Sequence, residues 1–322
     1  MSSTTETLVS EFETDAVVAS VRSVANDVVE VSVRAADGSA LPPWTPGAHI
    51  DLLLGPDLTR QYSLCGRLAE DGSYTVAVLK DPQGRGGSLA VHGLSEGQGL
   101  RIRGPRNNFP LAATGQYIFI AGGIGITPML PMIEAAIAGG TPWQLHYGGR
   151  TRASMAYLDQ LEHYGDAVDI VPQDERGILD LGEILGTIRP DTLVYVCGPE
   201  PLLAAVEAAC KPWPPGTLHL ERFAAKEIER DGDDTAFEVV LQRSGKTITV
   251  GADESVFDAM RAGGVSVLGS CLEGICGTCE TGVLEGEIDH RDSILDEDEQ
   301  EAMDTMMVCV SRCRGARLVL DA

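Results

Sequence analysis

Four cysteines near the C-terminus constrain this chain more than any other feature. They are Cys271, Cys276, Cys279 and Cys309, with the spacing C-x4-C-x2-C and then 29 residues before the last cysteine. This is the ligand spacing of a plant-type [2Fe–2S] cluster, in which four thiolates hold two irons. A structural zinc site usually pairs two C-x2-C knuckles, or one knuckle with a His-x3–5-His, and neither occurs here. The spacing favours an iron–sulfur loop, with zinc as the alternative.

Glycines punctuate the same segment, GSCLEGICGTCETG, which indicates a tight loop around the cysteines. Backbone N–H groups in such a loop can donate hydrogen bonds to the sulfurs and tune a reduction potential. A cluster of this type passes one electron at a time. The rest of the sequence is therefore expected to supply an electron donor.

The charge balance excludes some classes of partner. The 322 residues carry 48 Asp and Glu against 24 Lys and Arg, a formal net charge of −24. A phosphate backbone or an anionic membrane surface would repel such a chain, so we expect neither nucleic-acid nor membrane binding. The N-terminal residues show no basic and apolar export signal, and the other four cysteines are scattered, so we expect reduced thiols and a cytoplasmic location. The four are Cys65, Cys197, Cys210 and Cys313.

Two patterns of secondary structure succeed each other along the first two thirds of the chain. Residues 16–112 contain short alternating strands separated by Gly, Pro and Asp turns, which predicts an antiparallel barrel or sandwich. From about residue 114 to 222, buried strands alternate with helices, which predicts βαβ units and a parallel sheet. One helix is expected over SMAYLDQLEHYG, residues 154–165.

The rest of the chain reads as a linker and a third domain. Residues 224–235 are polar and charged, as expected of a linker. A hairpin that turns at Ser244–Gly245 follows, and then an amphipathic helix with Asp253 and Ser255 as alternative N-caps. We therefore predict domains at 1–113, 114–223 and 236–322, joined by the linker 224–235.

The segment IAGGIGITP, residues 120–128, joins a buried strand to a helix through a glycine-rich turn. Small residues there allow a phosphate to approach backbone amides, with Thr127 expected as the N-cap and Pro128 as the first helical residue. Pro128 stands where a G-x-G-x-x-G motif would have its last glycine, and no acidic residue follows the second strand. A Rossmann-type dehydrogenase is therefore disfavoured, and tight packing without a ligand remains the alternative.

Two further motifs are weaker alone. The turn Cys197-Gly198-Pro199 ends a predicted strand and opens a helix, where ligands of open α/β sheets bind. In the first domain, Arg60-Gln61-Tyr62-Ser63 offers a cation, a hydroxyl and an aromatic ring, and Gly84-Arg85-Gly86-Gly87-Ser88 can present amides to an anion.

Together, these motifs resemble those of the phthalate dioxygenase reductase family, which includes vanillate demethylase reductase. Their order along the chain is R-x-Y-S, G-R-G-G-S, G-G-I-G-I-T-P, C-G-P and C-x4-C-x2-C…C. The resemblance covers nearly the whole chain. It implies a multidomain protein with an FMN-binding antiparallel β-barrel, an α/β parallel-sheet NAD domain of the ferredoxin-reductase type and a C-terminal plant-type ferredoxin domain of the β-grasp fold. It also implies a monomer that passes electrons from NADH through FMN and a [2Fe–2S] cluster to a Rieske-type terminal oxygenase.

The resemblance also implies roles for single residues. Ser63 would lie close to the flavin N5 and Cys197 beside the nicotinamide, and we treat both as candidate catalytic residues. The other expected flavin contacts are Arg60, Tyr62, Lys80, Gly87, Ser88 and Phe223. Phe223 lies in the HLERF segment, which also contains Glu221. The other expected nucleotide contacts are Gly122, Gly123, Gly125, Thr127, Arg150, Gly198 and Pro199. The expected cluster ligands are Cys271, Cys276, Cys279 and Cys309.

Several points stay open at this stage. Cys313 is an alternative to Cys309 as the fourth ligand, although the 29-residue spacing favours Cys309. Arg150 and Arg152 could bind a 2′-phosphate, so NADPH is an alternative to NADH. The acidic run 296–301 could steer a basic oxygenase surface, or simply form a solvated helix face. Alternative functions are a reductase for a haem monooxygenase and a redox-sensing protein that passes no electrons on.

Overall fold

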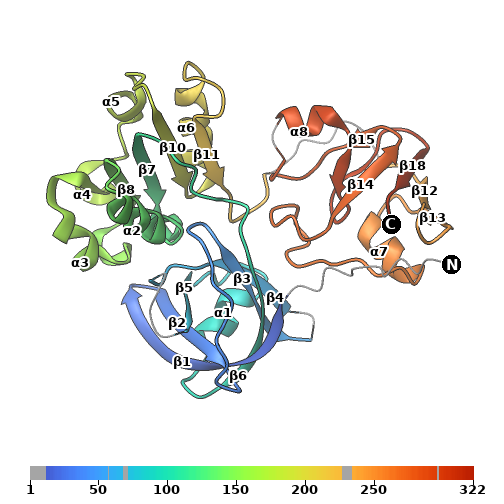
Figure 1. The fold of residues 1–322 in the computed structure, drawn as a ribbon, viewed down its shortest axis with the longest axis horizontal. Helices are drawn as coiled ribbons and strands as arrows, with labels where there is room; N and C mark the ends of the chain where they lie inside the picture. Colours follow the sequence, from blue (N-terminus) through green and yellow to red (C-terminus); the bar gives the residue numbers. More distant parts are fainter. Residues whose placement is uncertain (1–11, 57, 68–71, 227–233, 296) are drawn as a thin grey trace. The chain divides into compact units, whose positions relative to one another are not determined.

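The computed structural model describes residues 12–56, 58–67, 72–226, 234–295 and 297–322 (Figure 1). The chain packs as two compact units: Met1–Asp180 with Arg189–Tyr195, and Leu181–Ile188 with Val196–Ala322. Most of the expected linker 224–235 lies outside the described residues, and the three predicted domain boundaries stay predictions. Among the described helices, none has the length and apolar character that a membrane crossing requires.

The first sheet is an antiparallel barrel of six strands in the order β4-β3-β6-β1-β2-β5. A bridge between Leu64, just after β4, and Val76 of β5 joins the two outer strands of this order and closes the barrel. Alternating apolar residues fill the interior, including Val31, Ile50 and Leu52, each fully buried. The elements are β1 (Glu13–Ala25), β2 (Val28–Ala35), β3 (His49–Gly55), β4 (Leu58–Ser63), β5 (Tyr74–Leu79), the short helix α1 (Gly87–His92) and β6 (Gly99–Arg106).

The second sheet has the strand order β11-β10-β7-β8-β9, and β7, β8 and β9 pair in parallel. Strands β7 and β10 are nearly continuous apolar runs, as expected where helices cover a parallel sheet. The strands are β7 (Gln116–Gly122), β8 (Trp143–Gly149), β9 (Val168–Pro172), β10 (Thr192–Cys197) and β11 (Leu218–Glu221). The helices are η1 (Gly123–Ile126), α2 (Met129–Gly139), η2 (Arg152–Ser154), α3 (Leu158–Leu161), η3 (Glu162–Ala167), α4 (Gln173–Arg176), α5 (Leu181–Leu185) and α6 (Glu200–Cys210).

Two local expectations for this region were wrong. Thr127 does not cap α2, because η1 intervenes: the Thr127 hydroxyl donates to the carbonyl of Ile124 at 3.0 Å, and Pro128 stands at the N-cap. The single helix expected over residues 154–165 is broken, because Tyr157 adopts a left-handed φ of 64°. Only the short α3 and then η3 follow it.

The third sheet has the order β13-β12-β18-β14-β16, with β12 and β18 parallel and the other neighbouring pairs antiparallel. One helix, α7, packs its apolar side on the sheet through Val256, Phe257 and Met260. The hairpin turns at Ser244–Gly245 as predicted, and Ser255 is the N-cap of α7, since its Oγ accepts from the N–H of Asp258. The elements are β12 (Phe237–Leu241), β13 (Lys246–Val250), α7 (Val256–Ala262), β14 (Glu280–Glu285), β15 (Ile288–Asp289), α8 (Glu297–Ala302), β16 (Thr305–Met307), β17 (Arg312–Cys313) and β18 (Arg317–Leu320).

Candidate functional site

The four cysteines of the predicted cluster are all buried and form two interacting pairs. The Cys271 thiol donates to the Cys276 sulfur, and this shared proton lowers the pKa of Cys276 to about 5 and raises that of Cys271. Cys309 shares a proton with Cys279 in the same way, which lowers the pKa of Cys279 and raises that of Cys309. The two pairs also act on each other electrostatically.

This arrangement can be tested against the two candidate metals. In the described ranges, no three His, Cys, Asp or Glu side chains form a set suited to a single metal ion. Tetrahedral zinc would need four ligands around one point, whereas a [2Fe–2S] cluster takes two thiolates on each of two irons. The two pairs therefore fit the cluster better than zinc.

Backbone amides point at the sulfurs as the loop glycines predicted. The N–H of Glu273 donates to Cys271 Sγ at 3.3 Å, and the N–H of Gly274 donates to Cys309. Gly274 has a φ of 70°, and a Cβ there would lie 2.6 Å from Val310 Cγ2. The loop therefore requires a glycine at this position.

Cys313 lies apart from this group. It pairs with Ile288 between β17 and β15, and its thiol donates to the carbonyl of Arg317 at 3.5 Å. This placement favours Cys309 over Cys313 as the fourth ligand, in line with the spacing. The assignment of the four ligands stays a prediction.

In the barrel, the two expected flavin motifs meet although about 25 residues separate them. Arg60 Nη2 donates to the carbonyl of Arg85 at 2.8 Å. A Cβ on Gly87 would lie 2.3 Å from Arg60 Cγ, so only a glycine leaves room for the guanidinium. The Arg60 side chain thus lies against the glycine turn, and this cationic cradle fits the phosphate of FMN.

The other expected flavin residues are placed differently. Ser63 is buried at the end of β4, and burial raises the pKa of Tyr62 to about 12. Ser88 turns its hydroxyl to the backbone of Asp81, with which it makes two hydrogen bonds. Lys80 is exposed. The structure therefore brings Arg60 to the Gly84–Ser88 turn and leaves Lys80 on the surface.

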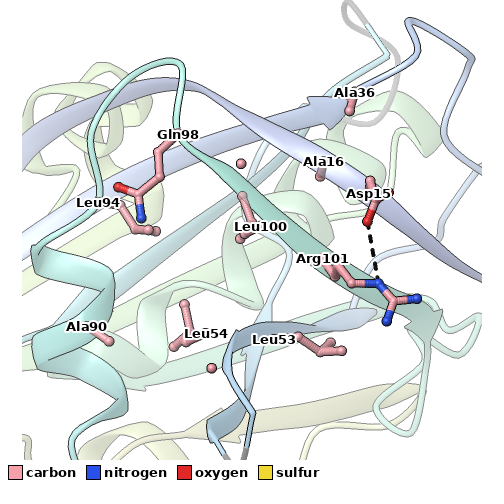
Figure 2. A pocket seen from close by; sticks show the side chains of 12 residues that line it. Asp15, Ala16, Ala36, Leu53, Leu54, Ala90, Leu94, Gln98, Leu100 and Arg101 are labelled. Carbon is pink, nitrogen blue, oxygen red and sulfur yellow. Dashed lines mark ion pairs between the residues drawn. The ribbon is translucent and has the colours of Figure 1, made fainter.

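A shallow hollow of about 600 Å³ lies elsewhere on the barrel, among β1, β3, β6 and α1 (Figure 2). An ion pair of 3.4 Å between Asp15 and Arg101 spans part of it. None of the expected flavin or nucleotide residues lines this hollow. The cofactor sites expected from the sequence therefore lie elsewhere.

The glycine-rich turn after β7 fits the approach of a nucleotide. Gly123 has a φ of 54°, and no atom lies within 4 Å of a Cβ built on it, so the backbone is open to a ligand. Gly122, Gly125 and Thr127 are buried around it. Of the two arginines after β8, Arg150 is exposed, and Arg152 forms an ion pair with Glu162. A surface ion pair of this kind is weak and does not decide between NADH and NADPH.

At the turn after β10, Cys197 is fully buried, and burial together with the Glu221 carboxylate raises the pKa of its thiol well above its ordinary value. Gly198 is half-buried, and Pro199 caps α6. Phe223 follows β11 with 40% of its surface exposed, so its ring is available to a ligand. A neutral, fully buried Cys197 is unsuited to act as a nucleophile, and its place beside the nicotinamide stays a prediction.

Sequence reasoning missed the partners that hold these motifs in place. Arg85 acts through its backbone carbonyl, and Glu273 through its N–H, so neither side chain carried a signal. A buried ion-pair network in the barrel was missed as well: Asp51 is fully buried and binds Arg103 and Arg106 at 2.8 and 2.6 Å. The arginines that recur along β6 were the sequence signal that could have predicted this network.

Comparisons with known proteins identify two domain families in this chain. Residues 239–314 match the 2Fe-2S iron-sulfur cluster binding domain family, and residues 119–208 match the oxidoreductase NAD-binding domain family. A solved structure described as phthalate dioxygenase reductase, a modular structure for electron transfer from pyridine nucleotides to [2Fe-2S], is 35% identical, with a TM-score of 0.72 over 96% of this chain and 98% of that one. The chain belongs to the phthalate dioxygenase reductase family.

Other relatives match nearly the whole chain as well. The phenoxybenzoate dioxygenase subunit beta of Ectopseudomonas oleovorans is 44% identical over 92% of this chain and 93% of its own length. An intact type IV self-sufficient cytochrome P450 monooxygenase is 43% identical, with a TM-score of 0.89 over 96% of this chain and 41% of that chain. The chain is thus an oxidoreductase with an NAD-binding domain and a ferredoxin domain, as predicted, and the predicted fold class is confirmed.

Proposed function

We propose that this chain is the reductase component of an oxygenase system, which passes electrons from NADH to a Rieske-type terminal oxygenase. The observation that carries the proposal is the paired arrangement of four thiols in a ferredoxin domain, on the same chain as a cationic flavin cradle and an open glycine turn. Family relatives that are named as dioxygenase components support the choice of partner.

Each group of residues would have a separate chemical role. Bound FMN supplies the conversion of a two-electron hydride into single electrons that a [2Fe–2S] cluster can take. Arg60 would hold the flavin phosphate, Ser63 would donate its hydroxyl near the reactive flavin nitrogen, and Gly123 would let the nucleotide lie on the backbone. The amides of Glu273 and Gly274 would stabilise the thiolates in the reduced cluster.

We propose that a basic surface of the oxygenase docks on the ferredoxin domain. From Ala236 to the C-terminus the chain has 17 acidic and 7 basic residues, a net charge of −10. Within the acidic run, Asp296 lies outside the described residues, while Asp298 and Glu299 line a hollow of about 580 Å³ together with Glu280 and Asp304. Glu280 directly follows Cys279, so this acidic surface adjoins a predicted cluster ligand.

Electron transfer to the partner then depends on salt. At about 0.15 M ionic strength the Debye length is about 8 Å, so added salt screens this attraction. We expect the second-order rate of oxygenase reduction to fall steeply as NaCl is raised. A rate that does not change with salt would leave the acidic run as a solvated helix face.

A haem monooxygenase is the second candidate partner. It is favoured by the self-sufficient cytochrome P450, of which this chain matches about two fifths. Reconstitution of the purified chain with a Rieske oxygenase and, separately, with a haem monooxygenase discriminates the two by the rate of NADH oxidation. NADH-dependent reduction of cytochrome c would argue against a sensor that passes no electrons on.

We also propose that the chain acts as a monomer in the cytoplasm. All eight cysteines are free of disulfides, as expected of a reducing compartment.

A further inference from the structure

A short segment after β8, Thr151–Tyr157, is fixed firmly to the nucleotide-binding sheet. Thr151 and Ser154 form a reciprocal capping box, and the N–H of Ala156 donates to the hydroxyl of Tyr147 at 3.0 Å. Met155 and Ala156 are buried, with 3% and 1% of their surface exposed. Arg150, an expected nucleotide contact, immediately precedes the segment.

The same segment is also bonded to the flavin barrel, within the same compact unit. The Tyr157 hydroxyl donates to Glu30 Oε2 on β2 at 2.9 Å, and the N–H of Asn26 donates to the carbonyl of Ala153 at 2.9 Å. Arg22 on β1 fixes the Glu30 carboxylate by hydrogen bonds of 2.5 and 2.9 Å. Tyr157 therefore meets a carboxylate that is already held in place.

A third partner links this contact to the flavin strand. Cys65 Sγ lies 3.5 Å from the Tyr157 hydroxyl, and Cys65 is two residues after Ser63 in the chain. Both Tyr157 and Cys65 are buried, with 9% and 8% of their surface exposed, so water does not compete for these bonds. Tyr157 keeps a left-handed backbone that a bulky side chain rarely adopts, which requires strong contacts around it.

We propose that Tyr157 is a positioning residue for hydride transfer: its hydroxyl, bonded to Glu30 and Cys65, holds the nucleotide-binding segment in register with the flavin strand. This inference rests on the proposed function, because it needs a flavin in the barrel and a nicotinamide on the sheet. Hydride transfer falls off steeply with small displacements of the donor, so a contact that fixes the two binding elements controls its rate.

The test is anaerobic stopped-flow reduction of the flavin by NADH in the full-length holoprotein. Tyr157→Phe keeps the buried ring and removes the hydrogen bond to a charged group. We expect the limiting rate of flavin reduction to fall about tenfold while flavin content stays at the wild-type value. With 4-deuterated NADH the slowed step should show the full primary isotope effect of hydride transfer, which a slowed binding or conformational step would suppress.

Matched variants keep the result interpretable. Tyr164 packs its ring on Trp143, and its hydroxyl makes no hydrogen bond among the described residues. The flavin of Tyr164→Phe should therefore be reduced at the wild-type rate. Glu30→Gln should slow the flavin reduction in the same direction, and the double variant should lose less than the two single effects together. If Tyr157→Phe does not retain flavin, the limiting rate of flavin reduction in Glu30→Gln tests the inference in its place.

Limiting rates within twofold of wild type for both Tyr157→Phe and Glu30→Gln would overturn the inference. A wild-type protein whose flavin NADH does not reduce would instead refute the proposed function, so the two failures are distinguishable.

Discussion

The cluster loop makes its sharpest prediction at Gly274. An alanine there keeps a φ of 70° and places a Cβ 2.6 Å from Val310 Cγ2 and 2.9 Å from Asp292 Cα. The left-handed backbone costs a non-glycine residue roughly 1–2 kcal/mol, and overpacking adds about 1–3 kcal/mol. We therefore expect Gly274→Ala to destabilise the ferredoxin domain by about 2–5 kcal/mol and to displace an N–H donor from Cys309.

Gly245 in the β12–β13 hairpin is the matched control. Its φ is 66°, and no atom lies within 4 Å of a Cβ at this position, so Gly245→Ala carries the backbone cost alone. The difference between the two variants, about 1–3 kcal/mol, isolates the close contacts of the cluster loop.

The assay is the temperature at which the visible absorbance of the cluster bleaches, together with the ratio of iron to flavin after purification. For a domain of this size, the difference lowers the midpoint of Gly274→Ala by at least about 4 °C relative to Gly245→Ala. Gly274→Ala should also lose iron, whereas Gly245→Ala should not. Equal midpoints and equal iron content in the two variants would refute the packing argument for this loop.

Three further predictions concern the cysteines, a buried histidine and the flavin cradle. Cys309→Ser should abolish the iron content while Cys313→Ser retains it; iron analysis checks this, and the reverse result would transfer the ligand role to Cys313. Burial beside Arg106 lowers the pKa of His49 to about 3, so the unfolded chain binds a proton below about pH 6.5 that the folded chain does not, and stability falls as the pH falls. The free energy of unfolding should fall by about 2 kcal/mol between pH 6.5 and 5 for this reason. Denaturation of His49→Leu over that range should show a smaller dependence of stability on pH, and the same dependence as in wild type would contradict the prediction. Arg60→Gln should weaken FMN binding about 10- to 100-fold, as measured by fluorescence titration. Arg34→Gln on β2 is the control and should bind FMN with wild-type affinity. Equal FMN affinities of the two variants would exclude a role of Arg60 in holding the phosphate.

Spacing and order predicted the chemistry of the chain because cluster ligands and glycine turns are local patterns. The cysteine spacing indicated two irons, and the structure adds the pairing of Cys271 with Cys276 and of Cys279 with Cys309. The hairpin at Ser244–Gly245 was predictable for the same local reason.

What the sequence could not predict depends on tertiary contacts. Both Asp253 and Ser255 satisfied the rules for an N-cap, and the fold selects Ser255. Periodicity over residues 154–165 predicted one helix, yet the contacts of Tyr157 with the barrel stabilise a left-handed residue that interrupts it. Arg60 likewise meets Arg85 only when the barrel closes. Long-range contacts of this kind leave no periodic trace in the sequence.

The most direct test of the whole account is an anaerobic titration of the purified chain with NADH, followed by flavin absorbance and by the EPR signal of a reduced [2Fe–2S] cluster. Two electrons for FMN and one for the cluster predict that about 1.5 NADH per chain bleach the flavin and bring the EPR signal to its maximum. A chain that contains zinc in place of iron, or a flavin that NADH reduces without any cluster signal, would contradict the account.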